Sequence, residues 1–443
     1  MNILIVVISK ISMIILKKMG RGTSFPGKLA LTLNKNIIKD FKLPSKTIFV
    51  TGTNGKSSIS GMLKGFYEAA GFTVGNNSKG SNLINGIITE FIEHSDLKGT
   101  INKDVLIIEI DERYIKEVFK DIKPHYLIVS NLARDQQARN GNFTIVFDDI
   151  KRVLTDDIHL FLNADDPIVT NLADGHNGKL TFYSLERTIY STKSPTYNNL
   201  DMLYCPRCNN KLNIEFFQYS NICSFKCNNC GFGNNIPDYQ GRLTKELDLE
   251  INGNLINLEN HALYTAYNYL ACYAVLKETG ISEELCMYAF KNTNYKIKRL
   301  AKFNYSKKNE TLLVCKVETP LTWNTSIEYI SRNNTNEAAV IIGFDKTSSR
   351  YKLKDISWVW DVNMSLLNDN KIKKIICIGE YAYDIKAKLK HDSVNLDKVE
   401  IELNSQRMVK IIEDMEYNNI FLVYALDMEK TFKKLLNGVN YEN

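Results

Sequence analysis

The sequence of 443 residues lacks an apolar run long enough to span a bilayer. Its most apolar stretch, residues 2–18, is interrupted by Lys10, whereas a membrane-spanning helix needs about 20 apolar residues. The stretch also has neither the basic start nor the small-residue cleavage site of a secretory signal. We expect a docked helix with Lys10, Lys17 and Lys18 facing water. Light association with a membrane is the alternative, because a basic amphipathic helix can lie at an interface.

A large excess of one charge is also missing. The 56 basic and 50 acidic residues give a net charge of +6, which is mild for this length and does not predict a nucleic-acid partner. The segment 295–308 is locally basic, and we expect it to be a solvated face. The sequence shows no internal repeat and no long low-complexity tract.

The nine cysteines do not form the pattern of a disulfide framework. Four of them lie in two Cys-x-x-Cys pairs, and Cys272, Cys315 and Cys377 stand alone in apolar surroundings. This usage suits a reducing compartment, so we expect the chain in the cytoplasm, either free or at the inner face of the membrane. None of the spare cysteines lies in a nucleophile-elbow pattern.

The length exceeds that of one ordinary core, which predicts two or three domains. Continuous apolar runs are typical of parallel strands covered on both faces, and they predict an α/β fold. These runs occupy residues 46–50, 104–110, 126–130, 159–163, 312–315, 338–342, 374–378 and 420–424. We expect an N-terminal helical segment at 1–45, a central domain at 46–300 with an insertion at about 201–235, and a smaller α/β domain at 301–443.

The segment from Val50 to Ser58 predicts a phosphate-binding loop. A strand precedes its glycine-rich turn and a helix follows, so backbone N–H groups, the helix N-terminus and Lys56 can all face phosphate oxygens. The standard phosphate loop has a glycine where this chain has Val50. We expect ATP to bind at Thr53, Asn54, Gly55, Lys56, Ser57 and Ser58.

Polar residues follow the other strands of the central domain. In an open α/β sheet, ligands bind beyond the carboxyl ends of the strands, so these residues should converge near the loop. They are Glu109, Asp111, Asn131, Asp135, Asn163, Asp165 and Asp166.

Two cysteine pairs predict a structural zinc site. Cys205 and Cys208 are separated by eighteen residues from Cys227 and Cys230, which is the spacing of a four-cysteine zinc ribbon. Four thiolates close the tetrahedron and leave no position for a substrate water. Four free thiols or a redox pair are the alternative, and Cys223 lies off the pattern.

The chain resembles the MurT subunits of lipid II isoglutaminyl synthase, relatives of the Mur ligases. The resemblance covers nearly the whole chain, and it includes the compact Thr-Gly-Thr-Asn-Gly-Lys-Ser loop and the four-cysteine insertion. The matching segments are residues 20–28, 51–57, 80–87, 109–112, 130–136, 162–167, 355–361 and 379–384. The chain departs from the family at Thr265 and at residues 315–320, and it leaves no room for a separate UDP-binding domain.

The resemblance implies a Mur-ligase-like P-loop ATPase domain with an inserted zinc ribbon. It further implies that ATP activates the α-carboxyl of D-glutamate in lipid II, and that ammonia from a GatD-type class I glutaminase then attacks the acyl phosphate. Lys56 would neutralise phosphate charge, Ser57 and Glu109 would hold magnesium, and Asn268 would contact adenine.

The resemblance also implies that an aspartate of the Asp-x-Ser-Trp motif reaches the glutaminase and completes its catalytic Cys–His pair. Asp355 is our assignment for that role, Asp361 is its rival, and a loop aspartate that caps a helix is the structural alternative. For the whole chain, the alternatives are a stand-alone Mur-type amino-acid ligase and a non-catalytic ATP-binding zinc scaffold.

Overall fold

The structure is a computed structural model, and it describes residues 3–18, 24–77, 82–134, 142–196, 200–258, 262–293, 300–305, 308–315, 318–345 and 355–425. Asp135 lies outside these residues, as do parts of the family-like segments 20–28, 80–87 and 130–136. The chain divides into two compact units. Unit 1 comprises residues 1–132, 143–193 and 202–295, and unit 2 comprises residues 133–142, 194–201 and 296–443.

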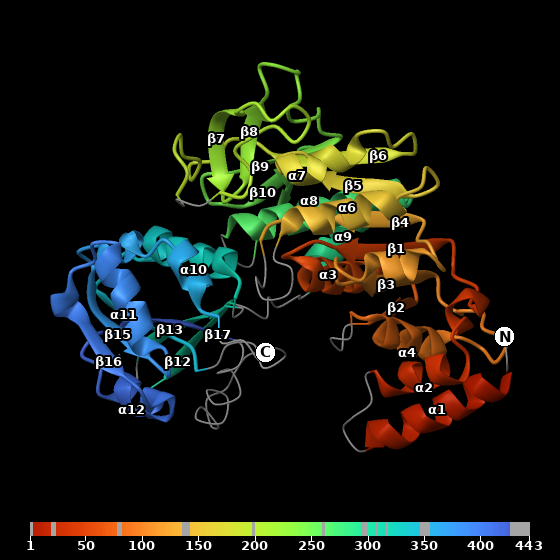
Figure 1. The fold of residues 1–443 in the computed structure, drawn as a ribbon, viewed down its shortest axis with the longest axis horizontal. Coiled ribbons are helices and arrows are strands. Elements are labelled where there is room, and N and C mark those ends of the chain that lie inside the picture. The colour runs from red at the N-terminus through yellow and green to blue at the C-terminus, as the bar shows by residue number, and fades with distance from the viewer. Residues whose placement is uncertain are drawn as a thin grey trace. The chain divides into compact units, whose positions relative to one another are not determined.

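Unit 1 is built on a nine-stranded sheet in the order β11-β10-β9-β6-β5-β4-β1-β3-β2 (Figure 1). The strands from β2 to β9 in this order are parallel, and β10 and β11 add an antiparallel edge. Their bounds are β1 Lys46–Thr51, β2 Val74–Asn76, β3 Val105–Glu109, β4 Tyr126–Val129, β5 His159–Asn163, β6 Leu180–Leu185, β9 Tyr239–Leu243, β10 Leu249–Ile251 and β11 Asn254–Ile256.

Helices cover both faces of this sheet, which explains why its strands are apolar without alternation. In β1, Ile48 and Val50 enter one buried cluster and Phe49 enters the other. The helices of unit 1 are α1 Ile3–Lys18, α2 Phe25–Leu33, α3 Lys56–Ala69, α4 Ile84–His94, α5 Ile115–Phe119, α6 Phe143–Val153, α7 Pro167–Thr170, α8 Leu263–Glu278 and α9 Glu283–Asn292, with 3-10 turns η1 Ile37–Asp40 and η3 Asn171–Ala173.

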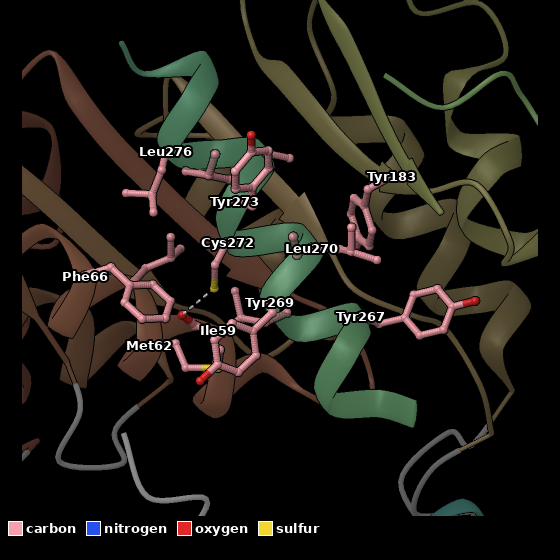
Figure 2. Packing of buried hydrophobic residues seen from close by; sticks show 14 of the residues in the cluster. Ile59, Met62, Phe66, Tyr183, Tyr267, Tyr269, Leu270, Cys272, Tyr273 and Leu276 are labelled. Atoms are coloured by element: carbon pink, nitrogen blue, oxygen red, sulfur yellow. Dashed lines mark hydrogen bonds between the residues drawn. The ribbon is translucent and has the colours of Figure 1, made fainter. Parts of the chain in front are cut away.

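Helix α8 is the buried centre of one of these faces. Thirteen of its sixteen residues are buried, so it is apolar on all sides rather than amphipathic. Figure 2 shows Tyr269 and Cys272 of α8 against Ile59 and Phe66 of α3. The Cys272 thiol lies 3.8 Å from the Ile59 carbonyl oxygen, and the Tyr269 ring centroid lies 5.9 Å from that of Phe66. This packing fixes α8 against the helix that follows the glycine-rich loop.

A separate two-stranded hairpin, β7 (Asn213–Tyr219) and β8 (Ile222–Lys226), lies between β6 and β9 in the chain. Both strands belong to the segment for which the sequence predicts a zinc ribbon.

Unit 2 is a second α/β layer on a six-stranded sheet in the order β12-β13-β17-β14-β15-β16. Only β12 is antiparallel to its neighbour. The elements are β12 Leu300–Tyr305, β13 Lys308–Cys315, β14 Ala338–Gly343, β15 Ile372–Ile378, β16 Val399–Glu402, β17 Asn419–Ala425, α10 Pro320–Asn333, α11 Ala382–His391 and α12 Met408–Glu413, with 3-10 turns η4 Ser357–Asp361, η5 Ser365–Asn368, η6 Leu396–Lys398 and η7 Ser405–Arg407.

Candidate active site and metal centre

The turn between β1 and α3 has the backbone of a phosphate loop. Gly52 and Gly55 have φ angles of 125° and 86°, which lie in the left-handed region that favours glycine. A Cβ on Gly52 would stand 2.3 Å from the Ser130 Oγ, and one on Gly55 would stand 2.9 Å from the Asn268 Oδ1. The loop is therefore closely surrounded, and glycine is needed at both positions.

Side chains that follow β4 hold the loop in shape. Asn131 accepts the Asn54 N–H at 3.1 Å and donates to the Asn54 carbonyl oxygen at 2.9 Å. The Ser130 hydroxyl also donates to this carbonyl, at 2.6 Å. Because β4 lies beside β1 in the sheet, the polar ends of the two strands meet, as the sequence predicts.

Lys56, the first residue of α3, has a buried ammonium group. The residue is 7% exposed, and its Nζ donates to the Glu112 carboxylate at 2.8 Å and to the carbonyl oxygens of Gly52 and Thr53. Burial alone would lower the pKa of Lys56, but Glu112 and Asp111 outweigh it, so the pKa is raised and the lysine stays charged.

Three acidic residues at the end of β3 surround this lysine. Glu109 is 8% exposed, and the Asn82 amide donates to its carboxylate at 3.2 Å. Burial raises the pKa of Asp111, but the Arg113 guanidinium at 2.9 Å outweighs burial and sets it below its usual range. Glu112 is 2% exposed. The site thus holds one buried lysine among the three buried carboxyl groups of Glu109, Asp111 and Glu112.

The loop has polar groups that a bound nucleotide could pair with. The side-chain nitrogen and oxygen of Asn54 are buried without a hydrogen-bond partner among the described residues. The first N–H groups of the 14-residue helix α3 also have no acceptor within the helix. A polyphosphate at the α3 N-terminus would provide oxygens for such donors, so these residues fit ATP.

The structure brings most of the predicted nucleotide residues together. Thr53, Asn54, Gly55, Lys56 and Ser57 lie on the loop and the first turn of α3, with Ser57 exposed and Ser58 half-buried. Asn268 reaches the same loop from α8, because the packing of α8 on α3 places its side chain next to Gly55. Its contact with adenine stays a prediction.

Glu112 belongs to the family-like segment 109–112, but no sequence pattern predicts a role for it. The residue is only three positions from Glu109, and the turn after β3 carries its side chain back to Lys56. A pattern of one lysine and several strand-end acids does not say which acid pairs with the lysine.

The four predicted zinc ligands form a compact cluster. Their Sγ atoms all lie within 4.8 Å of one another; Cys205 and Cys230 are 3.5 Å apart, and Cys208 and Cys227 are 3.4 Å apart. A tetrahedral zinc ion with sulfur ligands at about 2.3 Å places the sulfurs about 3.8 Å apart. The residues therefore fit zinc, and Cys223 is not part of the cluster.

The two cysteine pairs sit on matching backbone turns. The N–H of Cys205 donates to the Asn210 carbonyl, and the N–H of Asn209 returns to the Cys205 carbonyl. In the second turn, the N–H of Cys227 donates to the Phe232 carbonyl, and the N–H of Gly231 donates to the Cys227 carbonyl. Asn209 and Gly231, at the same place in each turn, have φ angles of 58° and 76°. Each turn carries two of the thiols, and the two equivalent turns direct all four thiols toward a single point.

Asp165 attaches the hairpin to the end of β5. Its carboxylate accepts from the Tyr267 hydroxyl at 2.7 Å, the Leu185 N–H at 3.0 Å and the Asn234 amide at 3.2 Å, and its carbonyl accepts the Cys223 N–H. Burial raises the pKa of Asp165 to about 7, although these hydrogen bonds oppose the rise. The strand-end acid therefore anchors the hairpin instead of facing the loop.

The two aspartates of the Asp-x-Ser-Trp segment have different surroundings within unit 2. Asp355 is half-buried and accepts the Ser357 N–H at 2.8 Å, at the start of the turn η4. Asp361, at the other end of η4, lies 3.6 Å from the Arg134 guanidinium, which also pairs with Asp201. Asp361 is thus held by a cation within its own unit.

Comparison with known proteins found a match in each unit. Residues 50–221 match the Mur ligase middle domain, and residues 317–426 match the MurT ligase C-terminal domain. The chain is similar to MurT subunits. It is 27% identical over 394 residues to lipid II isoglutaminyl synthase (glutamine-hydrolyzing) subunit MurT of Staphylococcus aureus (strain COL), which covers 87% of this chain and 86% of that protein. Identity to the subunit of the same name from Streptococcus pneumoniae (strain ATCC BAA-255 / R6) is 26% over 434 residues, or 95% and 94% of the two chains.

Solved structures of peptide ligases share the fold of this chain. A pseudomurein peptide ligase type C from Methanothermus fervidus has a TM-score of 0.68 at 20% identity and covers 90% of this chain and 80% of its own. A MurF ligase from Thermotoga maritima in complex with ADP has a TM-score of 0.57 at 11% identity, with 92% and 83% covered. The expected Mur-ligase-like α/β fold is confirmed.

Proposed function

We propose that this chain is the ATP-dependent subunit of a lipid II isoglutaminyl synthase. It activates the α-carboxyl of D-glutamate in the lipid II stem peptide as an acyl phosphate, and ammonia displaces the phosphate to give D-isoglutamine. The observation that supports this most is the buried Lys56 within a glycine-rich loop, in a chain that matches MurT subunits over most of its length.

The charges of the site suit phosphoryl transfer to a carboxylate. The reaction brings anions together, so the enzyme must supply positive potential where negative charge develops. Lys56 and the N-terminus of α3 supply it from the chain itself. Magnesium would add further neutralisation, and the Ser57 hydroxyl with the Glu109 carboxylate would hold it.

A GatD-type class I glutaminase would supply the ammonia. The curated relatives are named as subunits of a glutamine-hydrolyzing enzyme, which supports a partner for this chain. We assign Asp355 as the aspartate that orients the catalytic histidine of the partner. Asp361 already pairs with Arg134, whereas the hydrogen bond of Asp355 to Ser357 leaves a carboxylate oxygen for another donor.

The four-cysteine cluster would hold a structural zinc ion. Four sulfur ligands saturate the metal, so the ion stabilises the hairpin and takes no part in the reaction.

Reconstitution tests the proposal. The purified chain, mixed with its glutaminase partner, ATP, magnesium and glutamine, should convert lipid II to the amidated form, and mass spectrometry of the stem peptide should place the amide on the α-carboxyl of D-glutamate. A stand-alone amino-acid ligase would instead add a free amino acid without needing the partner. Product formed only with an amino acid would overturn the assignment.

A further inference from the structure

Helix α1 turns a continuous apolar stripe away from the protein. Its inner side buries Ile5, Val6, Ser9 and Met13. On the opposite side, six large aliphatic side chains are 38–64% exposed, and we call them the outer face: Ile3, Leu4, Ile8, Ile11, Ile14 and Ile15. Leu4, Ile8, Ile11 and Ile15 follow one another at the four- and three-residue steps of one helical stripe. Packing on the protein therefore buries only three of the eleven apolar residues of α1.

Two lysines fix the rotation of α1 about its axis. The Lys10 Nζ donates to the Ser95 carbonyl oxygen at 2.6 Å, and the Lys17 Nζ pairs with Glu93 at 2.7 Å. Both partners lie at the end of α4. Lys17 and Lys18 are exposed, as the sequence predicts, whereas Lys10 is half-buried against α4. Figure 1 shows α1 beside α2 and α4 at one end of unit 1. The outer face is thus held outwards by specific contacts on the other side of the helix.

The chain segment that carries the outer face has charges of one sign. Residues 1–39 contain seven lysines or arginines and no aspartate or glutamate. Lys18, Lys28, Lys35 and Lys39 are exposed, and α2 leaves Phe25 and Leu33 about half exposed. An apolar stripe among basic residues is complementary to a bilayer with anionic headgroups. A second copy of the chain would bring like charges together.

We propose that the outer face of α1 docks on the surface of an anionic lipid bilayer. The helix has 16 residues, and no helix among the described residues is long and apolar enough to cross a membrane, so α1 would lie in the interface. The benefit of docking rests on the proposed function, because a lipid-linked substrate is found at that surface. The docking itself follows from the exposed side chains and their charges.

Vesicle flotation with the full-length chain tests this proposal. The wild-type chain should float with vesicles made of equal parts of phosphatidylglycerol and phosphatidylcholine, and it should float less with phosphatidylcholine alone. The double variant Ile11→Glu/Ile15→Glu should lower the bound fraction about tenfold or more, because it removes two exposed aliphatic side chains that would enter the bilayer and adds charge repulsion. A second variant, Leu4→Glu/Ile8→Glu, should lower the bound fraction to a similar extent.

The matched control changes two exposed aliphatic residues elsewhere in unit 1. Ile236 and Leu255 are 91% and 57% exposed, and Ile236→Glu/Leu255→Glu should bind vesicles as the wild type does. Thermal unfolding of each variant checks the fold. Equal binding by both α1 variants and the wild type would overturn the proposal, as would a wild-type dimer that Ile11→Glu/Ile15→Glu dissociates without any vesicle binding. Vesicle binding without amidation activity would refute only the proposed function.

Discussion

At the scale of single residues, the burial of Lys56 decides how its role can be tested. From the sequence alone, Lys56→Ala is expected to remove activity and leave the fold intact. The structure changes this expectation, because Glu112 would lose its partner while only 2% exposed. An uncompensated buried charge costs about 3–5 kcal/mol, so the single variant should also unfold more easily.

The double variant Lys56→Ala/Glu112→Gln removes both charges and avoids this problem. We expect it to keep most of the stability and to lose ATP-dependent amidation by about 10²-fold or more, as when a charge-stabilising donor is deleted from an active site. Amidation rates and thermal unfolding measure the two effects separately. Lys64→Ala, on the exposed face of the same helix, is the control and should behave as wild type. A double variant with full activity would refute the nucleotide site.

Asp355 and Asp361 are distinguished by a pair of assays. Asp355→Asn should lower glutamine hydrolysis by the complex about 10²-fold or more, because the partner histidine loses its negatively charged orienting group. Amidation with added free ammonia should continue. Asp361→Asn weakens an ion pair with Arg134 and should leave glutamine hydrolysis nearly unchanged. If Asp355→Asn lowered both activities equally, or neither, the assignment of Asp355 to the partner would be wrong.

At the scale of elements, the hairpin β7–β8 depends on its metal. The double variant Cys208→Ser/Cys227→Ser should bind no zinc, and limited proteolysis should cut the segment 205–230 faster, because structural zinc contributes directly to folding. Elemental analysis of the purified chain should find one zinc ion per wild-type molecule. Cys223→Ala changes a buried cysteine of the same hairpin outside the cluster and should retain the metal. Zinc retained by the double variant would disprove the site.

The attachment of the hairpin should depend on pH through Asp165. Its pKa is about 7 in the folded chain and near 3.8 when unfolded, so between these values the folded state holds a proton that the unfolded state has released. The free energy of unfolding from this group therefore falls as pH rises from about 4 to about 7, by a few kcal/mol at most. Asp165→Asn should remove this slope from the unfolding temperature measured across that range, and the exposed Asp174→Asn should not. If the unfolding temperatures of Asp165→Asn and the wild type changed with pH in the same way, this pH dependence would not arise from Asp165.

Much of the element order could be predicted from the sequence, and the misses have physical causes. The run 159–163 is strand β5 in the structure, and the runs around 46–50 and 126–130 differ from their strands by one residue. Buried parallel strands give continuous apolar runs, which are easily recognised. Strand β12 was missed because its sequence, Leu-Ala-Lys-Phe-Asn-Tyr, is mixed, and an edge strand tolerates polar residues.

The site could be predicted only where residues are consecutive or regularly spaced. The loop 52–58 and the four cysteines are such cases, and the structure brings each group together. The pairing of Lys56 with Glu112 and the use of Asp165 as an anchor depend on how turns after β3 and β5 redirect the chain. Tertiary packing sets these directions, and no local pattern records them.

At the scale of the whole molecule, the central claim is that the chain transfers a phosphoryl group from ATP to the α-carboxyl of D-glutamate in lipid II. The most direct measurement follows oxygen. Lipid II with ¹⁸O in that carboxyl group is incubated with the chain, its glutaminase partner, ATP and glutamine, and the released phosphate is examined by mass spectrometry. An acyl phosphate requires one ¹⁸O atom to pass from each amidated carboxyl group to phosphate. Amidated product with unlabelled phosphate would contradict the account.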